Sequence, residues 1–250
     1  MAVVLVTVVV GGLVEPAAAY TAKGVGVVSA LRGEASVTHA PGVAARESRP
    51  AQEALRFRDD VFFQDVIDTQ RESTAKVLLK GRATLTIREL SRVELREGVV
   101  PGDPSRTRSI MGLLAGAFRA IVQRDTRAQD EMEIHTPNAV AAVRGTDVVV
   151  EVYRDAAPPP LPAAALEPTI QPASFPVAQA PGGTGATTRV FVREGELVMD
   201  GVRAAALQGL EKVGNLPPRL FQFTPDFIGR LVGRFAIAAV QAPQGRPRPR

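Results

Sequence analysis

The feature that most constrains the fold of this chain is a recurring pattern of apolar residues, a glycine, and then alternating apolar residues. Four segments carry the pattern: VVSALRGEASV (27–37), VLLKGRATLTI (77–87), LLAGAFRAIV (113–122) and VFVREGELVMDG (190–201). Glycine adopts the positive φ of a tight turn at little steric cost, so each segment predicts two short strands joined by a turn. Recurring hairpins indicate an all-β fold, either a sandwich or a wrapped, solenoid-like sheet.

The composition is consistent with such a fold. Aromatic residues make up only 5% of the chain and there is no tryptophan, so the core must consist mainly of aliphatic side chains. Valine is abundant and favours strands because it is β-branched. Residues 110–122 also place apolar residues at helical spacing, but Gly112 and Gly116 disfavour a helix, each by about 1 kcal/mol. We expect a strand there.

The beginning of the sequence predicts export. Residues 2–14 form an uncharged, mostly apolar run that is too short to span a bilayer comfortably. Residues 17–19 are three alanines, and small residues at this position are typical of a signal peptidase site. We expect residues 1–19 to be a signal peptide cleaved after Ala19, which would place the protein in the periplasm or cell envelope. The alternative is a buried N-terminal strand.

A proline-rich segment interrupts the strand pattern at residues 155–188, where eight prolines occur. Proline cannot donate a hydrogen bond to a sheet ladder, so the segment predicts an exposed loop or linker. Valine-rich strands flank it on both sides. We therefore expect a long insertion within one β domain, residues 20–215, and not a boundary between two domains.

The C-terminal part changes character and predicts a helical segment within residues 216–240. Thr224 is a suitable N-cap, Pro225 suits the first helical position, and Asp226 suits the first turn. Apolar residues then fall on one face and two arginines on another, which makes the helix amphipathic. We expect it to pack on the β domain. Residues 241–250 are basic and proline-rich, and we expect them to be disordered.

Catalytic patterns are missing from the sequence. The protein has no cysteine, which excludes thiolate nucleophiles and cysteine metal ligands, and only two histidines. His39 lies in THAPG and His135 precedes Thr-Pro, so we interpret both as surface turn residues. No GxSxG, HExxH or P-loop pattern occurs. These features predict a protein that is not an enzyme and that needs no cofactor and no metal.

The stretch EMEIHTPNAVAAVRGTDVVVEV, residues 131–152, resembles the FecR domain family. In that family a Thr-Pro turn precedes an apolar strand, and Arg-Gly-Thr leads into the next strand. The matching positions here are Thr136, Pro137, Arg144, Gly145 and Thr146. The resemblance extends over roughly residues 24–215 through LRFRDDVFFQDVIDT (55–69), STAKVLLKGRATLTIRELSRVEL (73–95), LLAGAFRAIV (113–122), VFVREGELVMDG (190–201) and ALQGLEKVGN (206–215).

The sequence departs from the family pattern in three respects, one of which is the proline-rich insertion at residues 155–188, where the family has a short link. Asp59 and Gln64 stand where the family has glycine before Asp60 and Asp65, and glutamine adopts a left-handed turn poorly, which predicts a reshaped turn. The namesake members are inner-membrane signal transducers with a cytoplasmic anti-sigma segment and a spanning helix. Here the resemblance implies a stand-alone exported member that lacks the anti-sigma segment.

We interpret the Arg-Gly-Thr block as a structural corner of the FecR-like fold. Gly145 would permit a sharp backbone path, and the hydroxyl of Thr146 would cap it. Arg144 would direct its five donors at carbonyls or a carboxylate at a strand end. The alternative is that Arg144 clamps an anionic ligand.

The function predicted from these observations is non-enzymatic binding, scaffolding or signal-linked interaction in the envelope. The expected partner is another envelope protein or cell-wall glycan. Alternatives are a glycan-processing enzyme, or a binder of nucleic acid or membrane surfaces, as the sequence pI of about 9.9 suggests. The formal net charge is only +4 and aromatic residues are few, so we expect no nucleic-acid partner. Membrane association through the C-terminal helix is expected to be weak.

Overall fold

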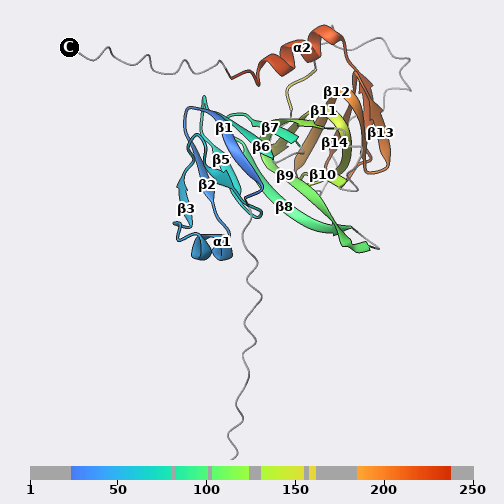
Figure 1. The fold of residues 1–250 in the computed structure, drawn as a ribbon. Coiled ribbons are helices and arrows are strands. Elements are labelled where there is room, and N and C mark those ends of the chain that lie inside the picture. Colours follow the sequence, from blue (N-terminus) through green and yellow to red (C-terminus); the bar gives the residue numbers. More distant parts are fainter. Residues whose placement is uncertain are drawn as a thin grey trace, which may run out of the picture.

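The protein is an all-β fold with a C-terminal helix, as the sequence predicts (Figure 1). The computed structural model describes residues 24–79, 83–100, 103–123, 131–154, 158–161 and 185–237. Within these residues, fifteen strands belong to a single curled sheet and two helices lie outside it. The expected signal peptide and the basic tail lie outside the described residues.

The elements follow one another along the sequence in an order dominated by strands. They are β1 (Gly26–Arg32), β2 (Ala35–Thr38), α1 (Pro41–Arg46), β3 (Gln52–Ala54), β4 (Asp60–Val61), β5 (Val66–Thr69), β6 (Thr74–Leu79), β7 (Ala83–Ile87), β8 (Arg92–Val100), β9 (Asp103–Val122), β10 (Glu131–His135), β11 (Val140–Arg154), β12 (Ala186–Met199), β13 (Val202–Ala205), β14 (Gln208–Val213), β15 (Arg219–Gln222) and α2 (Pro225–Gly233).

Strand β9 organises the sheet. Its first half pairs antiparallel with β8 and parallel with β10, and its second half pairs antiparallel with β7 and β11. The strands β1–β7 and β10–β14 consequently lie on either side of β9 (Figure 1). One hydrophobic core runs through both halves and includes Val28, Leu85, Val148 and Leu210. Burial of this aliphatic core is the main stabilising contribution to the fold.

Two of the four glycine-centred segments contain turns. Residues 77–87 form the expected hairpin, because β6 and β7 pair antiparallel, although Gly81 itself lies outside the described residues. Residues 27–37 turn at Gly33, where φ is 73°. The expected hairpin is wrong there, since β1 pairs with β4 and β6 while β2 pairs with β3 and β5. The turn leads the backbone from one part of the sheet to another.

The other two segments contain bulges, and the prediction of two strands joined by a turn is wrong for both. Gly116 and Gly195 have positive φ, 86° and 83°, but each lies inside one continuous strand, β9 and β12 respectively. The pairing register shifts beside each glycine. A β-bulge bends a strand without ending it. The sequence thus predicted which positions need glycine, and the pairing with neighbouring strands decided that they form bulges and not turns.

The C-terminal helix begins as predicted. The hydroxyl of Thr224 accepts a hydrogen bond from the amide of Phe227 at 3.3 Å, Pro225 opens the helix, and Asp226 lies in its first turn. The apolar face of α2 packs on the outer side of the sheet, in a second hydrophobic cluster that includes Phe191 of β12. In the part of the protein that the structure describes, no helix is long and apolar enough to cross a membrane.

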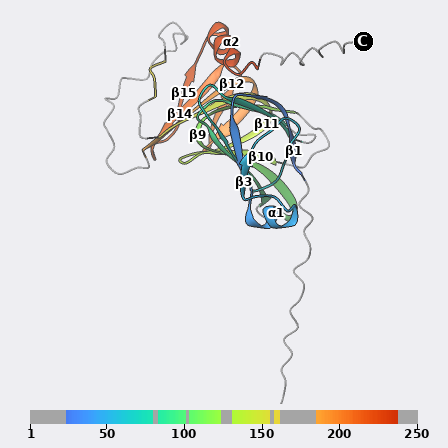
Figure 2. The same ribbon diagram turned by 90° about the vertical axis from the view of Figure 1, so that its left-hand side faces the viewer.

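The helical content differs from the sequence prediction in two places. The expected segment 216–240 begins with a strand, because residues 219–222 form β15 and pair with β14. A second, short helix, α1, was not predicted. It lies at the end of the molecule opposite α2 (Figures 1 and 2).

The proline-rich segment leaves and rejoins the sheet at one place. β11 ends at Arg154 and β12 begins at Ala186, and these two residues are paired. Strand β12 thus starts inside the expected insertion, 155–188. The carbonyl oxygen of Pro159 accepts a hydrogen bond from the buried guanidinium of Arg189 at 2.6 Å. Most of the remaining insertion lies outside the described residues.

The turn at Gln64 keeps its left-handed backbone, so the prediction of a reshaped turn is wrong. The φ of Gln64 is 69°, and at the preceding turn the positive φ belongs to Arg58 and not to Asp59. The backbone amide of Gln64 donates to the carbonyl of Leu95 at 2.5 Å. The carboxylate of Asp65 accepts from the backbone amide of Phe62 at 2.8 Å. These hydrogen bonds stabilise the turn although Gln64 carries a Cβ, which disfavours its left-handed backbone.

Replacing Gln64 with glycine is expected to raise the free energy of unfolding by about 0.5–1 kcal/mol. The substitution removes the strain of a left-handed residue that carries a Cβ, which exceeds the added entropy of glycine in the unfolded state. Urea melts measure the difference. Gln70→Gly is the matched control: its backbone is not left-handed, so it should lose about 0.5–1 kcal/mol. Equal losses for the two variants would contradict the strain at Gln64.

Candidate functional site

The Arg-Gly-Thr block lies in the middle of β11, where it forms a bulge and not the end of a strand. Gly145, with φ 61°, faces Gly195 of β12, and the register shifts between Arg144 and Asp147. A Cβ on Gly195 would overlap the carbonyl oxygen of Gly145 and would lie 3.0 Å from the Cα of Thr146. The two strands approach so closely that only glycine fits at position 195.

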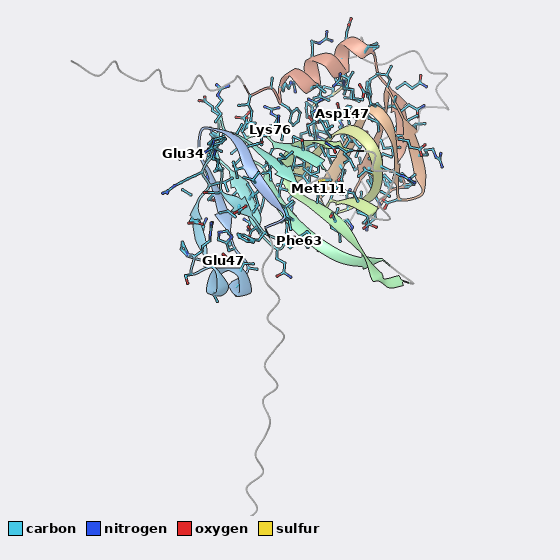
Figure 3. All side chains as sticks on the ribbon, in the orientation of Figure 1. Glu34, Glu47, Phe63, Lys76, Met111 and Asp147 are labelled. Atoms are coloured by element: carbon cyan, nitrogen blue, oxygen red, sulfur yellow. The ribbon has the colours of Figure 1, made fainter. Side chains whose placement is uncertain are left out.

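Thr146 of the block and the next residue, Asp147, fasten this bulge. The hydroxyl of Thr146 donates to the carbonyl of Glu196 at 2.7 Å. The carboxylate of Asp147, 7% exposed, accepts two hydrogen bonds from Arg119 at 2.8 and 2.6 Å and one from Arg193 at 2.9 Å. Bidentate pairing of this kind is strong and directional. The cluster ties β9, β11 and β12 together, in the half of the molecule where Figure 3 labels Asp147.

Arg144 does not make the contacts expected of it. Its side chain is exposed, and it has no hydrogen bond or ion pair within the described residues. Glu196, the residue paired with Arg144 across the strands, already accepts other hydrogen bonds. Its carbonyl accepts from Thr146, and its carboxylate accepts from Arg203 at 3.1 Å. The interpretation of Arg144 as the donor that fastens the corner is therefore corrected. The two arginines that hold Asp147 lie 28 and 46 residues away in the sequence, so local sequence reasoning missed them.

The Thr-Pro turn is bound firmly to the sheet through Asn138, a residue that sequence reasoning did not single out. The Nδ2 atom of Asn138 lies 3.0–3.1 Å from three backbone carbonyl oxygens, which belong to Ala186, Lys212 and Gly214. The hydroxyl of Thr188 donates to Asn138 Oδ1 at 2.6 Å, and Thr136 bonds the backbone of Ala139. Thr136 and Pro137 thus belong to a structural turn.

The two histidines differ in their surroundings. His135 pairs with the carboxylate of Glu133 at 2.7 Å and is partly exposed. His39 is buried, so its interpretation as a surface turn residue is wrong; Asp65 and Glu53 enclose its ring. Glu53 lies in β3 and Asp65 directly precedes β5, so the folding of the sheet brings both to His39. Among the described residues, no three His, Cys, Asp or Glu side chains converge as a metal site requires.

Comparison with known families identifies the central part of the protein. Residues 65–158 match the family model described as FecR protein. The resemblance to the FecR domain family is therefore confirmed for these residues. The FecR match contains both the Thr-Pro turn and the bulge at Gly145. Arg193 and Gly195, which complete the bulge, come from outside the matched segment.

The segment that matches the FecR family shares its sheet with strands that lie outside the matched residues. Strands β1–β4 precede it and β12–β15 follow it, yet all belong to the same sheet. The common core likewise draws residues from both flanks, including Val28 and Leu210. The folded unit of this protein is larger than the segment that matches the FecR family.

Solved structures add a distant likeness. Two crystal structures of a candidate anti-sigma factor from Parabacteroides distasonis ATCC 8503 are each 12% identical to this protein, with TM-scores of 0.42 and 0.43. The alignments cover 67% of this protein and 64% and 63% of the other, so this protein spans less than two thirds of those structures. No curated protein matches the sequence.

Proposed function

We propose that this protein is a non-enzymatic component of the bacterial envelope whose FecR-like β domain binds another envelope protein. The FecR match supports a regulatory, signal-linked role. An exported location is part of the proposal, and the sequence of residues 1–19 supports it. The observation that carries the proposal is the exposed guanidinium of Arg144 beside the bulge.

The face around Arg144 suits the close approach of a partner. Val140, Ala142 and Arg144 alternate along β11 and are all exposed, so they lie on one face of the sheet. The first two are uncharged, so Arg144 is the charged group of this row. Arg144 is well suited to lead an interface, since arginine is enriched among residues that dominate binding energy.

The charges near Arg144 indicate what the partner offers. Arg119 and Arg193 form ion pairs with Asp147, and Arg203 forms an ion pair with Glu196. Arg144 is consequently left with donors that nothing in the described residues accepts. A carboxylate on the partner protein would take two of them in a planar, bidentate pair. We infer that the partner presents an Asp or Glu side chain, or its own terminal carboxylate, to this face.

Replacing Arg144 with alanine is expected to abolish capture of the envelope partner while leaving stability within about 0.5 kcal/mol of the parent. An affinity pull-down from an envelope fraction measures binding, and a urea melt measures stability. Arg144→Lys should lose most of the binding as well, because lysine cannot form the bidentate pair. Arg203→Ala is the matched control, an exposed arginine already paired within the protein, and it should bind as the parent does.

Two outcomes would contradict this proposal. If Arg144→Ala loses several kcal/mol of stability, Arg144 has a structural role that the exposed side chain does not suggest. If the parent captures purified cell-wall glycan and no protein, the partner is glycan. In that case loss of capture on Arg144→Ala would still locate the binding face.

A further inference from the structure

The imidazole of His39 lies between two carboxylates in the interior of the N-terminal half of the molecule. Its Nδ1 is 2.8 Å from Asp65 Oδ1, and its Nε2 is 3.1 Å from Glu53 Oε1. The side chains of His39 and Asp65 are both 0% exposed. Arg49 Nη1 donates to the same oxygen of Glu53 at 2.9 Å. Among the described residues, Asp65, Glu53 and, through Glu53, Arg49 are the charged groups that face this ring.

The two hydrogen bonds of His39 require more protons than a neutral imidazole carries. An ionised carboxylate can only accept, and a neutral imidazole has one N–H donor. Glu53 is ionised and paired with Arg49, so the Nε2 of His39 must carry a proton. One further proton must lie between His39 Nδ1 and Asp65 Oδ1. It resides either on the ring, as imidazolium, or on Asp65, and the charge of the cluster is the same in both cases.

This cluster fastens a flap formed by residues 40–51, which contain α1. The flap begins after His39, whose amide donates to the carbonyl of Ala51 at 2.8 Å. Beneath it lies the buried ring of Phe62, edge-on to the imidazole and with the Arg49 guanidinium 5.8 Å above it. The flap lies outside the sheet, at the end of the molecule where Figure 3 labels Glu47.

We propose that the His39, Asp65 and Glu53 cluster is a pH-sensitive latch that holds the α1 flap closed while one proton is shared between His39 and Asp65. Loss of that proton as the pH rises leaves a ring lone pair facing a carboxylate oxygen at 2.8 Å, in a site where both side chains are buried away from solvent. The flap then opens and uncovers Phe62. In acid, protonation of Glu53 removes the negative charge that holds both His39 and Arg49, and the latch weakens again.

The carboxyl groups titrate in directions that agree with this latch. Hydrogen bonding from His39 lowers the pKa of Glu53, so its contribution to stability is present above pH 4.5 and is lost as the pH falls through the lowered value. Burial raises the pKa of Asp65 above 3.8, so its contribution is present in acid and is lost as the pH rises through the raised value. The latch is therefore tightest between these two limits.

Amide hydrogen exchange on the intact protein tests the latch. Protection factors of residues 39–54 should fall as the pH rises through the raised pKa of Asp65, by up to about tenfold per pH unit where closure takes up one proton. Protection in β11 and β12 should stay constant over that range. The ¹⁵N ring shifts of His39 in the unmodified protein should show whether the shared proton resides on the ring or on Asp65.

His39→Gln is the decisive variant, because an amide can bond one carboxylate but cannot carry the shared proton. Its flap should show weak protection at every pH, with a smaller pH dependence than in the unmodified protein, because the buried carboxyl of Asp65 still titrates. His135→Gln is the matched control: it removes the other histidine and should leave the pH dependence of the flap unchanged. A flap protection that stays flat in the unmodified protein overturns the proposal. So does a pH dependence in His39→Gln that is as steep as in the unmodified protein.

Discussion

Replacing Gly195 with alanine is expected to lower the free energy of unfolding by about 3–4 kcal/mol. The left-handed backbone, with φ 83°, strains any residue that carries a Cβ by about 1–2 kcal/mol. The new methyl group would also overlap the carbonyl oxygen of Gly145, which belongs to the backbone and cannot swing aside. β11 and β12 would have to separate next to the buried carboxylate of Asp147. Urea melts followed by far-UV circular dichroism measure the loss.

Gly201→Ala separates these two costs. Gly201 has almost the same backbone, with φ 84°, but a Cβ there would meet no atom within 4 Å. Only the backbone strain should appear, so the expected loss is about 1–2 kcal/mol. Equal losses at Gly195 and Gly201 would show that the close approach of the two strands contributes nothing.

Replacing Asn138 with alanine is expected to lower the free energy of unfolding by about 3 kcal/mol. The substitution removes the two N–H donors of Asn138, which three backbone carbonyls share, and the oxygen that accepts from the Thr188 hydroxyl at 2.6 Å. Each lost hydrogen bond contributes about 1 kcal/mol, and unsatisfied buried groups add to the cost. Thermal and urea melts at one pH measure the change.

Two further variants make the Asn138 experiment specific. Asn215→Ala is the control, because Asn215 is exposed and its side chain has no hydrogen bond within the described residues, so it should change stability by less than about 0.5 kcal/mol. Asn138→Asp keeps the shape but points a carboxylate at three carbonyls, and should be at least as harmful as alanine. Parent-like stability in Asn138→Asp would show that the amide donors do not hold the turn.

Local signals in the sequence predicted the elements whose formation is itself local. The N-cap at Thr224 and the proline after it act within one helical turn, and α2 begins there. The antiparallel pairing of β6 and β7 is likewise a contact between neighbours in the sequence. The FecR resemblance added the Arg-Gly-Thr block, whose Gly145 has the left-handed backbone that the sequence suggested.

The same reasoning misplaced features that depend on pairing between distant strands. A glycine with positive φ suits a turn and a bulge equally. Gly116 and Gly195 lie inside continuous strands because β9 passes from β8 to β7, and β12 from β14 to β13. The short helix α1 has Pro41 at its start, but it has no side-chain cap and no acidic residue in its first turn, so its local signal is weaker than that of α2. Its position follows from contacts made by the residues on either side.

In the candidate site, too, contacts between residues distant in the sequence were not predicted. Arg144 was conspicuous in the sequence, yet Arg119 and Arg193 hold the neighbouring carboxylate. His39 looked like a surface turn residue, and it is buried because Asp65 and Glu53 reach it from other parts of the sheet. No spacing rule brings these groups together, because their separation in the sequence bears no relation to their distance in space.

The sequence by itself determined the β class, the C-terminal helix and the positions that need glycine, because strand alternation, helix capping and backbone sterics act over a few residues. Only the tertiary structure decided which strands pair, which arginine meets Asp147 and which histidine is buried. Those outcomes depend on how the single sheet curls around its core. The curl brings Arg119, Asp147 and Arg193 together from three strands and leaves Arg144 exposed on the surface.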